Sequence, residues 1–352
     1  MQRVLNIAGR VIDDASPCYT IAEIGHNHQG EIEKAKELLL AAHEAGADAV
    51  KTQKRDNRGL FTKAFFDKPY ENENSFGPTY GEHREFLEFG REEYLELQRY
   101  AAELGITFFA TAFDHKSADF LADLDMPAYK IASGDLRNLP LIDHVASIGK
   151  PMIISIGGGA IDDAQRVYDT VTKHHHKLAM LQCTMSYPTE PKDVNLNVIP
   201  AMRERFPDVT IGFSDHYNGI AMAEAAYVLG ARIIEKHFTL NHTWKGTDHA
   251  LSLEPIGFKK MVRDLQRTGE ALGDGVKRVL PVEKGAIQKM GKALVAAADL
   301  KAGAVLDHAN VAAKSPGGDG LPPAEIDNVL GRKLKRDLKA DELIALSDLE
   351  NA

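Results

Sequence analysis

Two histidines follow two short apolar runs in the stretch from Thr210 to His237. The run VTIGF leads through SD to His216, the run ARIIE leads through Lys236 to His237, and AMAEAAYVLGA between them has the length and apolar spacing of one helix. A strand, a helix and a second strand form a βαβ unit with parallel strands. Both imidazoles are therefore expected at one rim, as a candidate divalent-metal site. A pair of hydrogen-bonded loop histidines is the alternative.

Other chemically active side chains also stand at the ends of apolar runs. Lys51 and Lys130, together with Ser133 and Ser155, form a candidate cradle for a phosphate or a carboxylate. Strand ends also carry Glu23, Thr111, Asp135 and Tyr187. Cations for an anion, carboxylates for proton transfer and imidazoles for a metal together favour an enzyme with a phosphorylated substrate.

These side chains need a repeated strand–helix architecture to bring them together. Several amphipathic helical patterns end in a glycine directly before the next strand, as in LGITFFA and LGARIIE. This pattern predicts a (β/α)8 barrel, with a doubly wound sheet as the alternative. The predicted strands are residues 19–25, 48–53, 106–113, 128–135, 151–157, 177–183, 209–215 and 231–237, and a helix is predicted at 254–272.

A long insertion, roughly residues 54–90, separates the second and third predicted strands. It is polar, contains aromatic residues and has few apolar positions. Long loops at a catalytic rim are often lids or binding loops, and a disordered surface insert is the alternative.

The sequence changes character after about residue 280, which predicts a barrel domain at 1–280, a linker at 281–290 and a small, mostly β domain at 291–352. Two segments of the last domain resemble each other, DLKAGAVLDHANV (299–311) and DLKADELIALSDL (337–349). Both have the pattern of a turn, a short strand and a turn.

Composition narrows the class of protein. The chain has 352 residues, 44% of them hydrophobic and 26% charged, and a net charge of −9, which argues against nucleic acid as the main partner. Two widely separated cysteines indicate no disulfide framework. Without a signal-peptide core or a membrane-spanning run, a cytoplasmic protein without a membrane partner is expected.

Seven motifs in order, IAEIGHNHQG, AGADAVKTQ, TAFD, YKIASGD, LQCTMSYPT, IGFSDH and EKHFT, resemble the sialic acid synthase family. This family includes N-acetylneuraminate synthases and the spore coat polysaccharide biosynthesis protein E group. The terminal segments DLKAGAVL, KSPGGDG and DLKADELI resemble its antifreeze-like (SAF) domain. The resemblance covers nearly the whole chain.

The resemblance implies a transferase that condenses phosphoenolpyruvate with an unphosphorylated, N-acetylmannosamine-like aldose to a 3-deoxy-2-keto nonulosonic acid and phosphate. It also implies a homodimer in which the SAF domain caps the partner's active site. The expected cofactor is a divalent metal, Mn²⁺ with Mg²⁺ or Co²⁺ as alternatives. By the same resemblance, His216 and His237 would hold the metal; Glu23, Asp135 and Lys51 would be catalytic; and Lys51, Thr111, Lys130, Ser133, Ser155, Tyr187, Asp248 and Lys314 would bind substrates.

The chain departs from the family pattern mainly on the acceptor side. Asp135 replaces a glutamate, Met185 replaces an asparagine, and Lys314 begins KSPG where the family has KRPG. These changes leave two alternatives open: a related phosphoenolpyruvate-dependent synthase with a different sugar acceptor, or a catalytically weakened homologue that binds carbohydrate or a partner.

Overall fold

The computed structural model describes residues 3–350, and the chain divides into two compact units, Met1–Gly273 and Asp274–Ala352. The division follows helix α12 (Pro255–Leu272), which packs on the barrel helices α1 and α11. The stretch predicted as a linker, 281–290, holds a 3-10 turn and the short helix α13 (Lys284–Met290). Among the described residues, no helix is long and apolar enough to cross a membrane.

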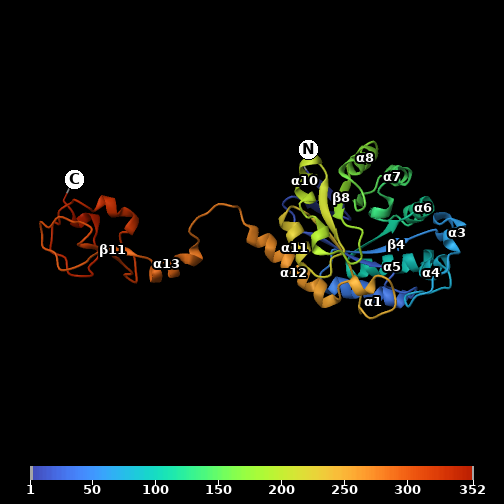
Figure 1. Cartoon of the computed structure of the whole chain (residues 1–352), viewed down its shortest axis with the longest axis horizontal. Helices are drawn as coiled ribbons and strands as arrows, with labels where there is room; N and C mark the ends of the chain where they lie inside the picture. Colours follow the sequence, from blue (N-terminus) through green and yellow to red (C-terminus); the bar gives the residue numbers. More distant parts are fainter. Residues whose placement is uncertain (1–2, 351–352) are drawn as a thin grey trace. The chain divides into compact units, whose positions relative to one another are not determined.

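Eight parallel strands close into a barrel in the first unit (Figure 1). Each strand pairs with the next along the chain, and the last pairs with the first, so the predicted (β/α)8 barrel is confirmed and the doubly wound sheet is not. The strands are β3 (Tyr19–Gly25), β4 (Ala49–Lys54), β5 (Thr107–Ala112), β6 (Tyr129–Ile131), β7 (Met152–Ser155), β8 (Leu178–Cys183), β9 (Thr210–Asp215) and β10 (Ile233–His237).

Amphipathic helices surround the strands (Figure 1). In α5, Tyr94, Leu97 and Ala101 are buried at helical spacing, and Gly105 ends the helix at φ 73°, as predicted for a glycine before the next strand. The helices that alternate with the strands are α1 (Ile32–Glu44), α5 (Arg91–Leu104), α6 (His115–Asp123), α7 (Leu139–Ser147), α8 (Ile161–Val171), α10 (Val198–Arg205), α11 (Ala221–Val228) and α12, with the short α9 (Pro191–Val194) before α10.

An N-terminal hairpin that the sequence did not predict closes one end of the barrel. Strands β1 (Val4–Ile7) and β2 (Arg10–Asp13) pair antiparallel. Their buried side chains Leu5, Ile7 and Ile12 join one cluster with residues of the barrel, among them Tyr19 and Ile153 near the amino ends of β3 and β7. Because this end is filled with apolar side chains, the barrel can offer a polar cavity only at its carboxyl end.

The insertion between β4 and β5 is folded. It contains α2 (Asn57–Leu60), α3 (Lys63–Phe66) and α4 (Tyr80–Phe86), the last begun by a capping box between Thr79 and Glu82. Tyr80 packs against aromatic rings from the rest of the segment, including Phe61 and Phe65. The disordered alternative is therefore excluded, and α4 is held in place by side-chain packing.

The second unit has its own core and short strands, β11 (Ala293–Ala296) and β12 (Val311–Lys314), with 3-10 turns and isolated bridges completing it. The two similar segments pair with each other: Leu300 and Leu338 exchange both backbone hydrogen bonds. Asp337 accepts from Ala302 N, and Asp299 accepts from Ala340 N, each at 2.9 Å. The internal repeat thus forms a pseudo-twofold arrangement.

Candidate active site

A cavity of about 420 Å³ lies at the carboxyl ends of the barrel strands. The structure brings ten of the predicted site residues to its wall: Glu23, Lys51, Thr111, Lys130, Ser133, Ser155, Tyr187, His216, His237 and Asp248. Strand alternation explains the grouping, because side chains two residues apart point to the same face of a strand. These polar groups come from distant parts of the sequence and converge only in the closed barrel.

Two buried lysines form the floor of the cavity. Lys51 Nζ donates to Thr111 Oγ1 at 2.7 Å, and Lys130 Nζ donates to Ser155 Oγ at 2.7 Å. Each lysine is only 2% exposed, so neither charge is solvated by bulk water. Because each hydroxyl accepts from a lysine, its own O–H remains free to donate to a bound anion.

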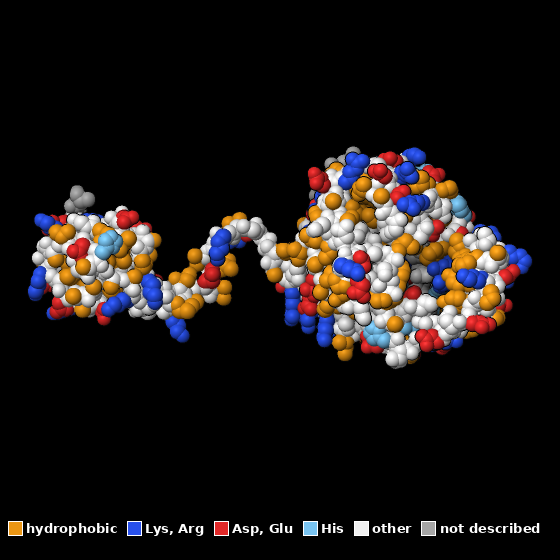
Figure 2. Space-filling model, in the orientation of Figure 1, with side chains coloured by type: hydrophobic (Ala, Val, Ile, Leu, Met, Phe, Trp, Pro, Cys, Tyr) orange, Lys and Arg blue, Asp and Glu red, His pale blue; other side chains and the backbone are white. Residues whose placement is uncertain are grey.

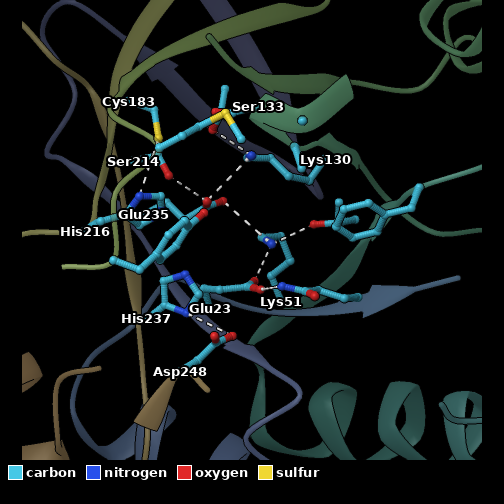
Figure 3. A pocket seen from close by; sticks show the side chains of 18 of the residues that line it. Glu23, Lys51, Lys130, Ser133, Cys183, Ser214, His216, Glu235, His237 and Asp248 are labelled. Carbon is cyan, nitrogen blue, oxygen red and sulfur yellow. Dashed lines mark hydrogen bonds and ion pairs between the residues drawn. The ribbon is translucent and has the colours of Figure 1, made fainter. Parts of the chain in front are cut away.

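Glu235 lies between the two lysines (Figure 3), and its carboxylate is 3.9 Å from Lys51 Nζ and 3.6 Å from Lys130 Nζ. Ser214 Oγ donates to it at 3.0 Å, and Glu23 forms a further ion pair with Lys51. Burial raises the pKa of Glu235, but Lys130 and Lys51 outweigh burial and lower that pKa to about 2. The floor is therefore an ionised network in which two carboxylates balance two ammonium groups.

The two histidines occupy one side of the cavity, with ring centroids 5.5 Å apart. His216 follows β9 directly and His237 ends β10, as predicted from the βαβ unit. His216 Nδ1 lies 2.9 Å from the carbonyl of Thr184 and must donate to it, so Nε2 carries the lone pair. Burial, and then His237, lowers the pKa of His216 to about 4, which keeps the ring neutral at neutral pH.

This pair fits a divalent metal. The Nδ1 atom of His237 is buried without a hydrogen-bond partner, and the nearest carboxylate oxygen recorded, on Asp248, is 3.8 Å away. Neutral imidazole is a common ligand of Mn²⁺, Co²⁺ and Zn²⁺. Residues 3–350 contain no cluster of three or more His, Cys, Asp or Glu side chains placed to hold a metal. Such an ion would therefore need further ligands from water or substrate.

Two predicted site residues, Asp135 and Lys314, are not among the side chains that line this cavity. Asp135 belongs to the 3-10 turn Ser133–Asp135, in which Ser133 faces the cavity while Asp135 lies outside its wall and accepts from Asn138 Nδ2 at 2.9 Å. Burial raises the pKa of Asp135. Lys314 is an exposed residue of the second unit, where it pairs with Asp341.

Several residues that line the cavity were given no site role from the sequence, among them Gln53 and Glu235, which stand at predicted strand ends, and Arg55, Arg84 and Ser214. Period-two alternation provides a signal for Ser214 and Glu235, because each stands two residues before a candidate metal-ligating histidine. Gln53 Nε2 donates to Glu23 Oε1 at 2.7 Å, and Arg55 donates to Gln53 Oε1 at 2.7 Å. These contacts connect the floor to the outer wall.

Other polar residues near these strand ends have structural partners. Lys236 and Asp215 form a fully buried ion pair at 2.8 Å, and Asp215 also accepts from Tyr217 N at 2.8 Å. His28 stacks on Phe89 with centroids 4.0 Å apart. These groups hold strands and loops in position.

Comparisons with known proteins agree with this geometry. The sequence model of the NeuB family matches residues 38–277, and that of the SAF domain matches residues 291–350. N-acetylneuraminate-9-phosphate synthase of Homo sapiens is 40% identical over 97% of this chain and 96% of its own length. N,N'-diacetyllegionaminic acid synthase of Legionella pneumophila is 34% identical over 95% of each chain. The crystal structure of N-acetylneuraminic acid synthetase from Leptospira borgpetersenii is 29% identical, with a TM-score of 0.72 over 82% of this chain and 96% of that one.

Proposed function

The chain belongs to the NeuB family, and from this premise we propose that it condenses phosphoenolpyruvate with the open-chain aldehyde of an N-acylated hexosamine. The products are a 3-deoxy-2-keto nonulosonic acid and inorganic phosphate. The chain is a carbon–carbon-forming transferase of the synthase type. The observation that carries the proposal is the pair of buried lysines, each with a hydroxyl partner, in the same cavity as His216 and His237.

The cavity floor is suited to phosphoenolpyruvate. Lys51 and Lys130 supply positive charge, and Thr111 and Ser155 turn their free O–H groups to the anion. Ser133 Oγ accepts from Gly157 N at 3.0 Å, so its own O–H remains free to donate beside them. Glu23 and Glu235 already form ion pairs with these lysines. An anion bound here is therefore held by the hydroxyl donors as much as by the net charge of the floor.

His216 and His237 would hold a divalent metal, for which Mn²⁺ is proposed and Mg²⁺ or Co²⁺ are alternatives. When bound, the ion supplies a Lewis acid for the carbonyl oxygen of the acceptor. The Thr184 carbonyl fixes the tautomer of His216, so its Nε2 lone pair remains available as a ligand. Tyr187 packs on His216 with centroids 4.1 Å apart and limits the motion of that ring.

The reaction balances with these groups. A bond forms between C3 of phosphoenolpyruvate and the aldehyde carbon, and the aldehyde oxygen gains a proton. Water adds to C2, and phosphate leaves with the former enol oxygen; the two protons of that water go to the aldehyde oxygen and to phosphate as C2 becomes a ketone. Glu23 faces the cavity within reach of Lys51 and Gln53, which positions its carboxylate to hydrogen-bond the acceptor or transfer a proton.

The relatives leave the acceptor class open. The human relative is named for a 9-phosphate product, whereas the Legionella and Leptospira relatives are named for acids without a phosphate. In this condensation the first three carbons of the product come from phosphoenolpyruvate. A phosphate on C9 of a product would therefore come from C6 of the acceptor sugar.

We also propose a homodimer in which the second unit of one copy caps the cavity of the other, with Lys314 near the acceptor. Support comes from the apolar side chains exposed on residues 274–290 (Figure 2). Val276, Val279, Val282 and Met290 are each more than 60% exposed, which is unusual for side chains of this kind. Light scattering on the full chain tests this, and a monomer at micromolar concentration would contradict it.

Phosphate release from phosphoenolpyruvate tests the activity directly. With Mn²⁺, a panel of N-acylated hexosamines and their 6-phosphates should include at least one acceptor that triggers release. Lys130→Ala should abolish release, whereas Lys150→Ala, at a surface ion pair, should leave it unchanged. If no sugar triggers release while the metal still binds, the synthase function is wrong and the weakened carbohydrate-binding homologue is favoured.

Metal binding is tested separately by titration calorimetry on the purified chain. His216→Ala and His237→Ala should each lose binding of Mn²⁺ while the far-ultraviolet circular dichroism spectrum stays that of the wild type. His174→Ala is the matched control, because His174 pairs with Asp143 on the surface. Retention of stoichiometric metal in both cavity variants would remove the assignment.

A further inference from the structure

Arg84 is a cavity residue that the proposed reaction does not use. It lies on α4 of the insertion, and its side chain lines the cavity. Its guanidinium donates from Nε to Tyr80 Oη at 3.2 Å and lies 3.1 Å from His26 Nδ1. Across residues 3–350, no carboxylate lies within 4.0 Å of it, whereas Arg58 on the same insertion pairs with Glu85 at 2.9 Å. Arg84 therefore brings an unneutralised charge to the cavity wall.

A second guanidinium lies beside it. Arg55 is 8% exposed, stacks on Phe113 at 3.7 Å and lies 3.3 Å from His26 Nε2. The nearby carboxylate of Glu88 is 3.9 Å from Arg55 and 3.2 Å from Lys54, so it is shared. Burial, and then the charge of Arg84, lowers the pKa of Arg55 to about 10, and the group remains cationic at neutral pH.

His26 lies between the two guanidiniums and cannot satisfy both. Burial, followed by Arg55 and Arg84, holds the pKa of His26 well below its usual value, so the ring is neutral. A neutral imidazole has one acceptor nitrogen, whereas guanidinium groups only donate. At least one N–H facing His26 therefore lacks an acceptor in the protein. A ligand rich in acceptor oxygens would supply it.

The location of Arg84 and Arg55 in the cavity indicates which part of the acceptor sugar they face. Asp248 lies 3.8 Å from His237 Nδ1, and Asp248 and Arg84 line the same cavity. Asp248 is thus next to one candidate metal ligand and shares the cavity with Arg84. A sugar whose aldehyde lies at the histidines and whose hydroxyls face Asp248 would point its far end to Arg84.

We propose that Arg84, supported by Arg55, binds a phosphate on the terminal carbon of the acceptor, so that the substrate is an N-acylated hexosamine 6-phosphate. This inference rests on the proposed function and departs from the unphosphorylated acceptor expected from the sequence. The planar guanidinium fork matches phosphate oxygens in a bidentate geometry. The phosphoenolpyruvate anion has its own cations at the floor, Lys51 and Lys130.

Steady-state kinetics with paired acceptors test the inference. At saturating phosphoenolpyruvate and Mn²⁺, N-acetylmannosamine 6-phosphate should be used with a kcat/KM about 100-fold above that of N-acetylmannosamine, as expected for charge-assisted hydrogen bonds. Arg84→Ala should raise the KM of the phosphorylated sugar about 10- to 100-fold and remove the discrimination. Arg84→Lys should recover part of it, and Arg58→Ala, the matched control on the insertion, should behave as the wild type.

Binding without turnover provides a second readout. In calorimetry with saturating phosphoenolpyruvate and no metal, the phosphorylated sugar should bind the wild type more tightly than Arg84→Ala, and the plain sugar should bind both alike. The inference is overturned if the unphosphorylated sugar is the better substrate, or if Arg84→Ala raises the KM of phosphoenolpyruvate instead. If neither sugar releases phosphate from phosphoenolpyruvate, the proposed function itself fails, and this inference with it.

Discussion

Replacing Glu235 with glutamine leaves two buried lysines without the carboxylate they share. The substitution preserves the volume of the side chain and an oxygen that accepts from Ser214 Oγ, which lies 3.0 Å away. It removes the negative charge at 3.6 Å from Lys130 and 3.9 Å from Lys51. The folded protein must then hold Lys130 with no carboxylate within 4.0 Å among the described residues, while Lys51 keeps Glu23.

The size of the effect follows from these distances. At an effective dielectric constant of about 20, each lost attraction amounts to roughly 4 kcal/mol before solvation is counted. Removing one partner of a buried ion pair costs about 3–5 kcal/mol in measured cases. Because Lys51 retains a counterion and the cavity admits water, we expect Glu235→Gln to lower the free energy of unfolding by about 3 kcal/mol.

Urea unfolding followed by circular dichroism measures this difference, with and without inorganic phosphate. Phosphate should stabilise Glu235→Gln more than the wild type, because an anion at the floor replaces the missing charge. The exposed Glu37 on α1 provides the control, and Glu37→Gln should change stability by less than about 0.5 kcal/mol. Equal stability of Glu235→Gln and the wild type, or a deficit that phosphate does not reduce, would refute the account of the floor as a charge-balanced anion site.

Two further predictions concern the insertion. Gly81→Ala places a methyl group against the ring of the buried Phe66 and should destabilise the insertion by about 1–3 kcal/mol, measured by local hydrogen exchange. Gly285→Ala in α13 is the control, because its methyl group meets no atom within 4 Å and should be neutral or slightly stabilising. Equal effects of the two substitutions would contradict this packing. Burial, and then Arg84, lowers the pKa of His83 from 6.5 to about 4, so the unfolded chain takes up a proton first and stability falls as the pH drops from 6.5 towards 4. His83→Asn should remove up to about 2 kcal/mol of the loss between pH 8 and pH 5 in thermal unfolding, and an unchanged pH profile would exclude His83 as its source.

Most of the barrel could be predicted from the sequence because its signals are local and repeated. All eight strands lie where short apolar runs end in polar residues, and the glycine at residue 105 ends α5 as the pattern predicted. The N-terminal hairpin was missed, since its two strands have four residues each and too few positions to show a period. The second unit was predicted as mostly β. Its strands β11 and β12 have four residues each, and isolated β-bridges connect its other segments.

The sequence by itself determined which side chains stand at strand ends, because parallel strands bring their carboxyl ends to one rim. It therefore placed His216, His237, Lys51 and Lys130 in one site. Only the tertiary structure decided the partners, such as the position of Glu235 between the two lysines and of Asp135 outside the cavity wall. The tertiary structure also brought Arg84 to the cavity, because an insertion without periodic pattern is positioned by packing against distant elements rather than by the chain's local preference.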